Sequence, residues 1–396
     1  MAERVPRVCP TCDHDARTLL YPQRFVAFAS DALLDGYDVV ACERCGMVYA
    51  DGIPEQQAFD AYYAAMSKYE YADRDGRESP YDLARFAAMA DAVRPSLRES
   101  DTVVDIGCAT GGLLEAFRTR GIANVHGVDP SPACARAAER LYGIPVGVGT
   151  IAALPPLPES IQLITLVGVV EHLRDVREAL RVVRDALAPD GLLFVEVPDA
   201  EGFGSHPGPP FQEFSVEHVN FLSALGTQNL LAAAGFETVW CRRTAREWAP
   251  ASIAPVVYGL FRRTDAAVPI TPDQSARDGV SRYVAEGRAD EALVAARLDA
   301  ALPPGTQCIV WGAGTHTQRL FATGVLSVER VALIVDGNPH YRGRSIGGVP
   351  ISAPSAVATR SEPVLISTRT YQEEIATQLR DTLRLPNALI RLYDVG

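Results

Sequence analysis

The chain has 396 residues, enough for two or three domains with separate hydrophobic cores. Its composition, 47% hydrophobic and 22% charged, is that of a globular protein and excludes a disordered or fibrous one. The formal net charge of −12 argues against an extended nucleic-acid surface, because phosphate binding requires a basic face.

Membrane insertion and export are also not expected. Charged or polar residues interrupt every apolar run before membrane-spanning length, and the N-terminal residues lack the apolar stretch of a secretory signal. Of the eight cysteines, four cluster near the N-terminus and four are scattered, which is no disulfide framework. This usage suits a reducing compartment, so we expect a cytoplasmic protein.

The clustered cysteines form two Cys-x-x-Cys pairs, Cys9 with Cys12 and Cys42 with Cys45. Two such pairs separated by a loop have the spacing of a tetrahedral four-cysteine Zn²⁺ site. The alternatives are ordinary buried thiols or a redox dithiol. Because four thiolates leave no coordination position open, the predicted metal is structural. Residues 37–41 and 47–50 read as strands beside the second pair.

After this module the pattern becomes helical over 55–66, with aromatic residues on one side, and again from Pro80 to about residue 92. The segment between the two helices, around Tyr71, reads as a polar loop with aromatic residues. Such a loop either covers the mouth of the next domain or simply packs against it.

Residues from about 96 to 244 alternate short β-like runs with helical ones. This alternation predicts a doubly wound, largely parallel α/β sheet. The predicted strands are 102–105, 125–129, 145–148, 163–167, 192–197 and 237–241, and the predicted helices include 133–142 and 176–187.

The first of these strands runs into a glycine loop that precedes a helix. It has the pattern acidic-x-Gly-x-x-x-Gly, with Asp105, Gly107, Cys108, Ala109 and Gly111. A strand, a tight glycine turn and a helix N-terminus place a nucleotide-like ligand at the edge of an α/β sheet. The loop lacks the last glycine of the dinucleotide fingerprint. It resembles the first motif of class I S-adenosyl-L-methionine-dependent methyltransferases.

The second strand ends at Asp129-Pro130, about 20 residues beyond the glycine turn. An acid in this position can accept hydrogen bonds from ribose hydroxyls, or it can cap the following helix, and the two roles are compatible. We therefore expect Asp129 and Pro130 to border the cofactor.

Later segments extend the same resemblance. Residues 161–173 resemble the fourth-strand region of small-molecule methyltransferases, where a Glu-His pair, here Glu171-His172, opens the next helix. The acid usual early in that strand is Gln162 here. Residues 188–193 resemble the turn before the fifth strand. A nicotinamide enzyme would account for the glycine loop but not for these later elements.

Beyond the fifth strand, a Gly/Pro-rich stretch leads to Glu217-His218. Histidine titrates near neutral pH and suits a general base, and a neighbouring carboxylate can orient it. The alternative is a histidine that caps the next helix or stabilises a turn.

The order of a four-cysteine module, a methyltransferase core, a Glu-His loop and a second α/β domain resembles the sugar C-methyltransferases. This resemblance implies methylation of the carbon next to a ketone in a nucleotide-linked deoxysugar. It also implies that His218 is the base, that Glu217 serves catalysis, and that His172 and Tyr71 line the same pocket. Two departures are Ser215, where the family often has tyrosine, and the sequence after Tyr71, which lacks a serine-rich turn.

The remaining residues predict a linker over 249–271, a helix over 290–302 and a second α/β unit. Strand, glycine turn and helix recur around Gly312 and Gly314, and further strands are predicted at 331–335, 363–367 and 388–393. The resemblance implies that Gly312, Gly314 and His316 face the substrate, although a scaffolding role fits equally.

The predicted architecture is therefore α/β: a Rossmann-like class I methyltransferase core over 76–245, an N-terminal zinc-binding module over 1–75 and a second Rossmann-like domain over 246–396. The predicted function is a natural-product C-methyltransferase acting on a small molecule, a nucleotide-linked keto sugar. Two alternatives are an O- or N-methyltransferase and a non-catalytic zinc-ribbon protein with a degenerate methyltransferase fold.

Overall fold

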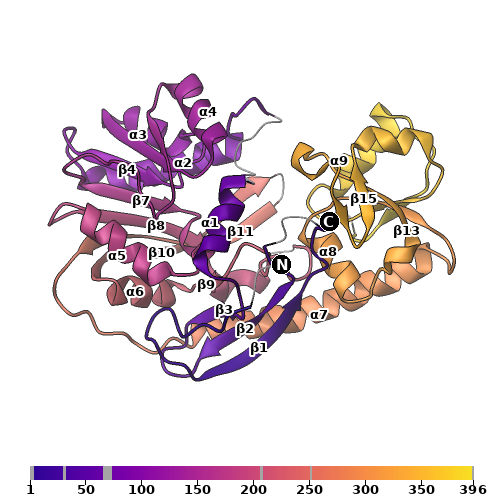
Figure 1. The fold of residues 1–396 in the computed structure, drawn as a ribbon, viewed down its shortest axis with the longest axis horizontal. Helices are drawn as coiled ribbons and strands as arrows, with labels where there is room; N and C mark the ends of the chain where they lie inside the picture. Colours follow the sequence, from indigo (N-terminus) through magenta and orange to yellow (C-terminus); the bar gives the residue numbers. More distant parts are fainter. Residues whose placement is uncertain (1–3, 30–32, 66–73, 206–207, 250–251, 395–396) are drawn as a thin grey trace.

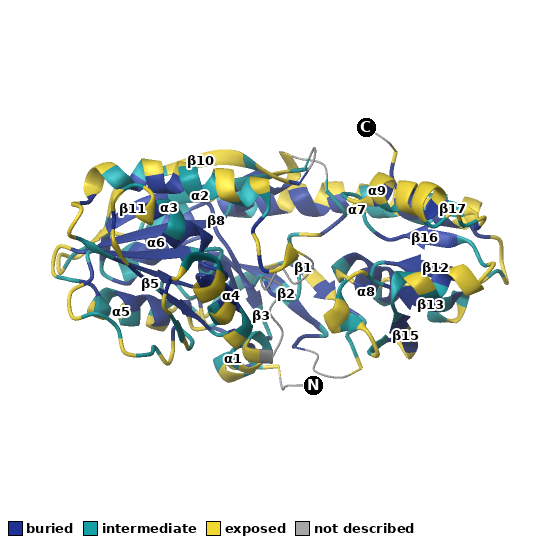
Figure 2. Cartoon of the chain, turned by 90° about the horizontal axis from the view of Figure 1, so that it is seen from above, coloured by how far each residue is buried: buried dark blue, intermediate teal, exposed yellow. Residues whose placement is uncertain are grey.

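The computed structural model describes residues 4–29, 33–65, 74–205, 208–249 and 252–394. The chain forms two lobes connected by one long helix, α7 (Ser275–Ala301), which runs along the bottom of the molecule in Figure 1. Most strands of the two lobes are buried, whereas β10 (Phe236–Ala249) is largely exposed, and the helices present their exposed faces outward (Figure 2). Within the described ranges, no helix has both the length and the apolar character needed to span a membrane.

The larger lobe contains a seven-stranded sheet with the order β10-β11-β8-β7-β4-β5-β6. Five of its strands are parallel, which confirms the expected doubly wound sheet. The strands are β4 (Thr102–Ile106), β5 (Asn124–Asp129), β6 (Val146–Val148), β7 (Leu163–Val167), β8 (Leu192–Pro198), β10 (Phe236–Ala249) and β11 (Ser252–Arg263).

Alternation along these strands builds one hydrophobic layer on each face of the sheet. Val103 and Phe194 face one core and their neighbours Val104 and Val195 face the other, as the period of two in a strand requires. The first layer packs on α2 (Pro80–Val93) and α3 (Gly112–Arg118), and the second on α5 (Val176–Ala186) and α6 (Ala224–Ala233).

The prediction of a linker with some helix over 249–271 is wrong up to residue 263. β10 and β11 form a long antiparallel hairpin, and β11 also pairs with β8 across the sheet. The sheet therefore continues to residue 263, past the boundary placed at 245. Pro255 is tolerated in β11 because the ladder with β8 begins only at Val256, so its missing N–H is not needed there.

The N-terminal segment forms a four-stranded antiparallel sheet with the order β1-β2-β3-β9. β2 (Gly36–Cys42) and β3 (Val48–Asp51) match the expected strands, whereas β1 (Arg17–Arg24) was not predicted. The fourth strand, β9 (Asn220–Phe221), comes from far along the chain, directly after the Glu217-His218 loop. The helix α1 (Gln56–Ala65) follows β3.

Helix α7 begins well before the expected residue 290. Its first half packs closely on residues 200–205, where a Cβ on Gly279 would stand 2.5 Å from the Ala200 carbonyl oxygen. Its second half supplies Val294 and Leu298 to the core of the smaller lobe. One helix thus belongs to the cores of both lobes.

The smaller lobe contains a six-stranded sheet with the order β14-β15-β13-β12-β16-β17, parallel except for the edge pair β14–β15. Its strands are β12 (Cys308–Trp311), β13 (Val331–Val335), β14 (Ser345–Ile346), β15 (Val349–Ser352), β16 (Val364–Ile366) and β17 (Leu389–Arg391). The helices α8 (Thr315–Ala322) and α9 (Gln372–Thr377) complete the second α/β unit that the sequence predicts.

Candidate active site

The site lies where the chain changes direction across the large sheet. From β4 the chain moves to β5 and β6 on one side and then returns through β7 to the other side. Such a switch point opens a crevice at the carboxyl ends of the strands, the usual ligand position in open α/β sheets. The glycine loop follows β4, and the Glu171-His172 segment follows β7.

The glycine loop depends on backbone conformations that favour glycine. Gly107 and Gly111 have φ angles of +81° and +89°, in the left-handed region. A Cβ on Gly107 would also lie 2.6 Å from Cγ2 of Val169, two residues before Glu171. The loop after β4 and the segment after β7 are therefore in direct contact.

Asp129 holds this loop in place from the end of β5. Its carboxylate accepts hydrogen bonds from the Ala109 and Ser131 backbone N–H groups, both at 2.9 Å. The cap of α4 (Pro132–Tyr142) is Ser131, whose hydroxyl accepts from Cys134 N–H, so the alternative role of Asp129 as helix cap is wrong. Pro130 lies between Asp129 and Ser131 in the sequence.

Two further residues of the motif are buried beneath the loop. Asp105 is 3% exposed and accepts a hydrogen bond from the Thr165 hydroxyl at 2.6 Å. Burial raises the pKa of Asp105 to about 7, against the opposing effect of that hydrogen bond. Cys108 is buried in the core, and burial raises the pKa of its thiol well above the ordinary value.

A buried carboxylate that the sequence did not single out supports the loop from outside. Glu78, immediately before α2, accepts hydrogen bonds from the Thr110 hydroxyl at 2.7 Å and from the Tyr142 hydroxyl. Gly112 leaves it room, because a Cβ there would lie 2.6 Å from Glu78 Oε1. No sequence motif marks Glu78.

A second group of polar side chains gathers near the carboxyl end of β7. The Tyr62 hydroxyl donates to Glu217 Oε1 at 3.0 Å, and the Tyr63 hydroxyl lies 3.0 Å from His172 Nδ1. The His172 and His218 rings are 5.0 Å apart between centroids. The structure thus brings together three of the predicted catalytic residues, His172, Glu217 and His218.

Tyr71, the fourth, lies outside the described residues. Two tyrosines of α1, Tyr62 and Tyr63, contact the same group instead. The helical pattern over 55–66 placed them on one face, but only the tertiary structure shows what that face meets.

Charged groups surround this cluster. Burial raises the pKa of Glu171 and raises that of Glu213 to about 7. Arg246 of β10 forms an ion pair with Glu196 of β8 at 3.1 Å, and Arg85 pairs with the same carboxylate. Apart from Glu171, which was recognised only as part of the Glu171-His172 pair, these residues were not predicted, because they come from separate elements that only the folded sheet brings together.

A cavity of about 560 Å³ lies between residues of the larger lobe and residues of the smaller lobe. Glu213 lines it together with the hairpin tip, α7 and the loop after β16. Trp248 and Tyr371, both about two-fifths exposed, form an edge-to-face pair there. Arg369 contributes a guanidinium to the same wall.

The residues predicted to face substrate in the smaller lobe have a different setting. His316 is buried, with Nδ1 3.0 Å from the Ser367 hydroxyl and Nε2 2.9 Å from the Tyr393 hydroxyl. Gly312 has a φ of +115° and packs against Ser367. Both ring nitrogens of His316 are therefore engaged within the lobe.

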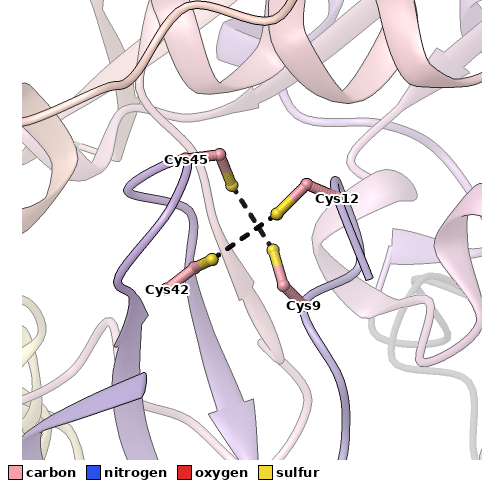
Figure 3. Close-up of side chains that lie close together, drawn as sticks. All are labelled: Cys9, Cys12, Cys42 and Cys45. Carbon is pink, nitrogen blue, oxygen red and sulfur yellow. Dashed lines mark hydrogen bonds between the residues drawn. The ribbon is translucent and has the colours of Figure 1, made fainter. Parts of the chain in front are cut away.

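The side chains of the four clustered cysteines point toward one another near the end of β2 (Figure 3). The Sγ atoms of Cys9 and Cys45 are 3.4 Å apart, those of Cys12 and Cys42 are 3.6 Å apart, and all four lie within 4.8 Å of one another. Thiolates around Zn²⁺ at about 2.3 Å would be about 3.8 Å apart, so little movement would be required.

The backbone around these thiols favours the thiolate form. N–H groups of Thr11 and Cys12 point at Cys9, and that of Met47 points at Cys45. The hydrogen bond between Cys9 and Cys45 lowers the pKa of Cys45 and raises that of Cys9, because the two thiols share one proton. The donor set and its surroundings therefore fit a structural Zn²⁺ ion.

Residues 80–240 match the family model described as a methyltransferase domain. Over these residues the chain is similar to methyltransferases.

Among those relatives is the C-methyltransferase NovU of Streptomyces niveus, 31% identical over 170 residues. The alignment covers 41% of this chain and 37% of NovU. A ubiquinone biosynthesis O-methyltransferase of Rhizobium etli (strain CIAT 652) is 34% identical over 110 residues, 26% of this chain and 44% of that protein. The chain thus matches less than half the length of both relatives.

Among solved structures, the 1,6-didemethyltoxoflavin-N1-methyltransferase of Burkholderia thailandensis superposes with a TM-score of 0.42 at 18% identity, covering 56% of this chain and 97% of that one. An S-adenosylmethionine-dependent methyltransferase of Mesorhizobium loti gives a TM-score of 0.38 at 19% identity, with 46% and 100% covered.

Proposed function

We propose that the protein transfers a methyl group from S-adenosyl-L-methionine to a carbon next to a ketone, in a nucleotide-linked deoxysugar. The observation that carries this proposal is the cluster of His172, Glu217 and His218 next to the glycine loop, at the same edge of the sheet. The name of the relative NovU, a C-methyltransferase, supports the same reaction class.

The donor would lie along the loop after β4. Gly107 and Gly111 allow the main chain to approach its amino-acid end, and Asp129 would face its ribose. The bound donor supplies an electrophilic methyl group. The chain's own task is to align that group with the acceptor atom in a site without water.

A carbon acceptor must first lose a proton, which requires a base and a group that stabilises the enolate oxygen. We assign the base to His218 and its orientation to Glu217, whose carboxylate is held by Tyr62. Tyr71, or His172 in its protonated form, would stabilise the enolate. An oxygen or nitrogen acceptor would need less of this machinery.

The large cavity offers a place for the rest of such an acceptor. Arg369 provides a positive charge for a diphosphate, and the rings of Trp248 and Tyr371 offer faces for a base. Glu213, which lines this cavity, precedes Glu217 by four residues in the chain. The acceptor's nucleotide would thus occupy the side facing the smaller lobe.

We also propose that Cys9, Cys12, Cys42 and Cys45 bind one structural Zn²⁺ ion. Three of these thiols belong to the hydrophobic core that α5 and α6 share. The metal would therefore stabilise the contact between the N-terminal sheet and the large sheet.

Ser215 supports a second candidate function, in which the methyl group is transferred to oxygen or nitrogen. Its hydroxyl accepts from the Glu217 and His218 backbone N–H groups, both at 3.2 Å. It therefore shapes the loop and provides no phenol for an enolate. NMR of the product, carbon-bound or heteroatom-bound, separates the two candidates.

The test uses a panel of nucleotide-linked keto sugars, with mass gain and solvent deuterium exchange at the acceptor carbon as readouts. His218→Ala should abolish exchange and leave cofactor affinity intact, whereas His340→Ala, an exposed histidine of the smaller lobe, should change neither. Near-normal turnover in His218→Ala would overturn the assignment of the base. Failure of the protein to bind S-adenosylmethionine in calorimetry would favour a non-catalytic binding protein.

A further inference from the structure

Three potential metal ligands meet at the carboxyl end of β7, apart from the four-cysteine cluster. Glu171 and His172 belong to a short 3-10 helix, η4 (Val170–His172), and His218 comes from the loop before β9. Their ligand atoms all lie within 4.8 Å of one another. Glu171 and His172 are both buried.

The surroundings of His172 determine which of its nitrogens carries the proton. Nδ1 lies 3.1 Å from the Glu217 carbonyl oxygen, which can only accept a hydrogen bond. Nδ1 is therefore the protonated nitrogen, and Tyr63 can accept from it as well. The neutral ring then presents the lone pair of Nε2 to Glu171. An Nδ1–H bound to a backbone carbonyl is also the usual support of a metal-ligating histidine.

Glu171 presents the complementary half of the site. Its Oε1 faces His172 Nε2 at 3.9 Å, and its Oε2 is buried without a hydrogen-bond partner among the described residues. Two buried acceptors that face each other are unfavourable unless a proton or a cation lies between them. Burial raises the pKa of Glu171, the positive charge of Arg246 offsets this rise only in part, and the Arg246 guanidinium forms its ion pair with Glu196, at 3.1 Å.

We propose that Glu171, His172 and His218 bind one divalent transition-metal ion of the Zn²⁺ class, and that this ion inhibits the enzyme. Two imidazole nitrogens and one carboxylate oxygen form a donor set suited to Zn²⁺ and related ions. Ligand atoms around such an ion at about 2.1 Å lie about 3.4 Å apart, so the pair at 3.9 Å needs to close by about half an ångström. The inhibition rests on the proposed function, because it requires that His218 be the base.

Binding is tested first, on the full chain without substrates. Co²⁺ is titrated and followed by its visible absorption, because an ion held by nitrogen and oxygen lacks the thiolate charge-transfer bands of a four-cysteine site. We expect one equivalent of Co²⁺ per chain to bind with the spectrum of an ion held by nitrogen and oxygen ligands. Glu171→Gln and His218→Ala should each weaken Co²⁺ binding about 100-fold. Each variant loses a direct ligand, and the loss of a group that only supports a ligand already costs up to about 100-fold. Glu178→Gln, an exposed carboxylate on α5, should bind Co²⁺ as the unaltered protein does.

Inhibition is tested separately, as the Zn²⁺ concentration that halves methyl transfer. This concentration should equal the dissociation constant of the site and rise about 100-fold in Glu171→Gln. If no Co²⁺ binds with a nitrogen–oxygen spectrum, or if Glu171→Gln binds that Co²⁺ with unchanged affinity, the metal site is refuted. If the ion binds through these residues but turnover does not change, the site stands and the assignment of His218 as base fails.

Discussion

The buried histidine of the smaller lobe makes its stability sensitive to acid. His316 is 6% exposed and lies between the Ser367 and Tyr393 hydroxyls. Burial lowers the pKa of His316 from 6.5 to about 4, and the charge of Arg319 acts in the same direction. The folded lobe therefore holds this ring neutral at pH values where the unfolded chain protonates it.

The size of the effect follows from that difference in pKa. It amounts to about 2.5 pH units, and each unit corresponds to about 1.4 kcal/mol, so the contribution of His316 is about 3 kcal/mol. Because the folded-state pKa is the lower one, this stability is present above pH 6.5. It is lost progressively as the pH falls from 6.5 to about 4.

The assay is urea unfolding between pH 7.5 and 4, followed by the fluorescence of Trp311, which is buried in the smaller lobe. Trp240→Phe and Trp248→Phe in every sample leave Trp311 as the single tryptophan. His316→Gln keeps a polar side chain that does not titrate. The free energy of unfolding should fall about 3 kcal/mol further in the protein with His316 than in the variant. Parallel pH profiles for the two proteins would refute the reasoning.

Three other predictions concern the larger lobe. Gly107→Ala should weaken S-adenosylmethionine binding at least tenfold in calorimetry, since its Cβ meets Val169; Gly143→Ala, equally left-handed but in open space, should leave that affinity unchanged. Cys42→Ser should release the metal and lower the midpoint of thermal unfolding, with zinc content per chain as the direct measure. Tyr62→Phe should reduce turnover by roughly 10- to 100-fold, because it removes a hydrogen bond to a carboxylate, and unchanged kinetics would place Glu217 outside the reaction.

Local patterns sufficed for much of the large sheet and for the glycine loop. The strand that contains Asp105 and the strand that ends at Asp129 are continuous motifs, and their functional residues follow one another in the sequence. The hairpin β10–β11 was missed, because a proline-containing apolar stretch resembles a linker until its partner β8 is known. Strand pairing depends on neighbours that sequence periodicity does not specify.

The acceptor side was less predictable for the same reason. Glu217 and His218 are adjacent in the sequence and were recognised together, but Tyr62 reaches Glu217 across 155 positions. Glu171 stood beside a predicted residue, and only its burial in the folded chain gives it a distinct role. Contacts of this kind arise from packing between modules, which no single segment encodes.

The short strand β9 limits how this chain can be recombined with others. Val48 and Tyr49 pair with Phe221 and Asn220, so the segment that carries His218 completes a sheet built mostly from the first 51 residues. In a chimera joined between residues 75 and 76, β9 would pair with a β3 strand from another protein, and both tyrosines of α1 would be lost. Exchange of acceptor preference between related chains should therefore require that the N-terminal module and the 211–223 loop be transferred together.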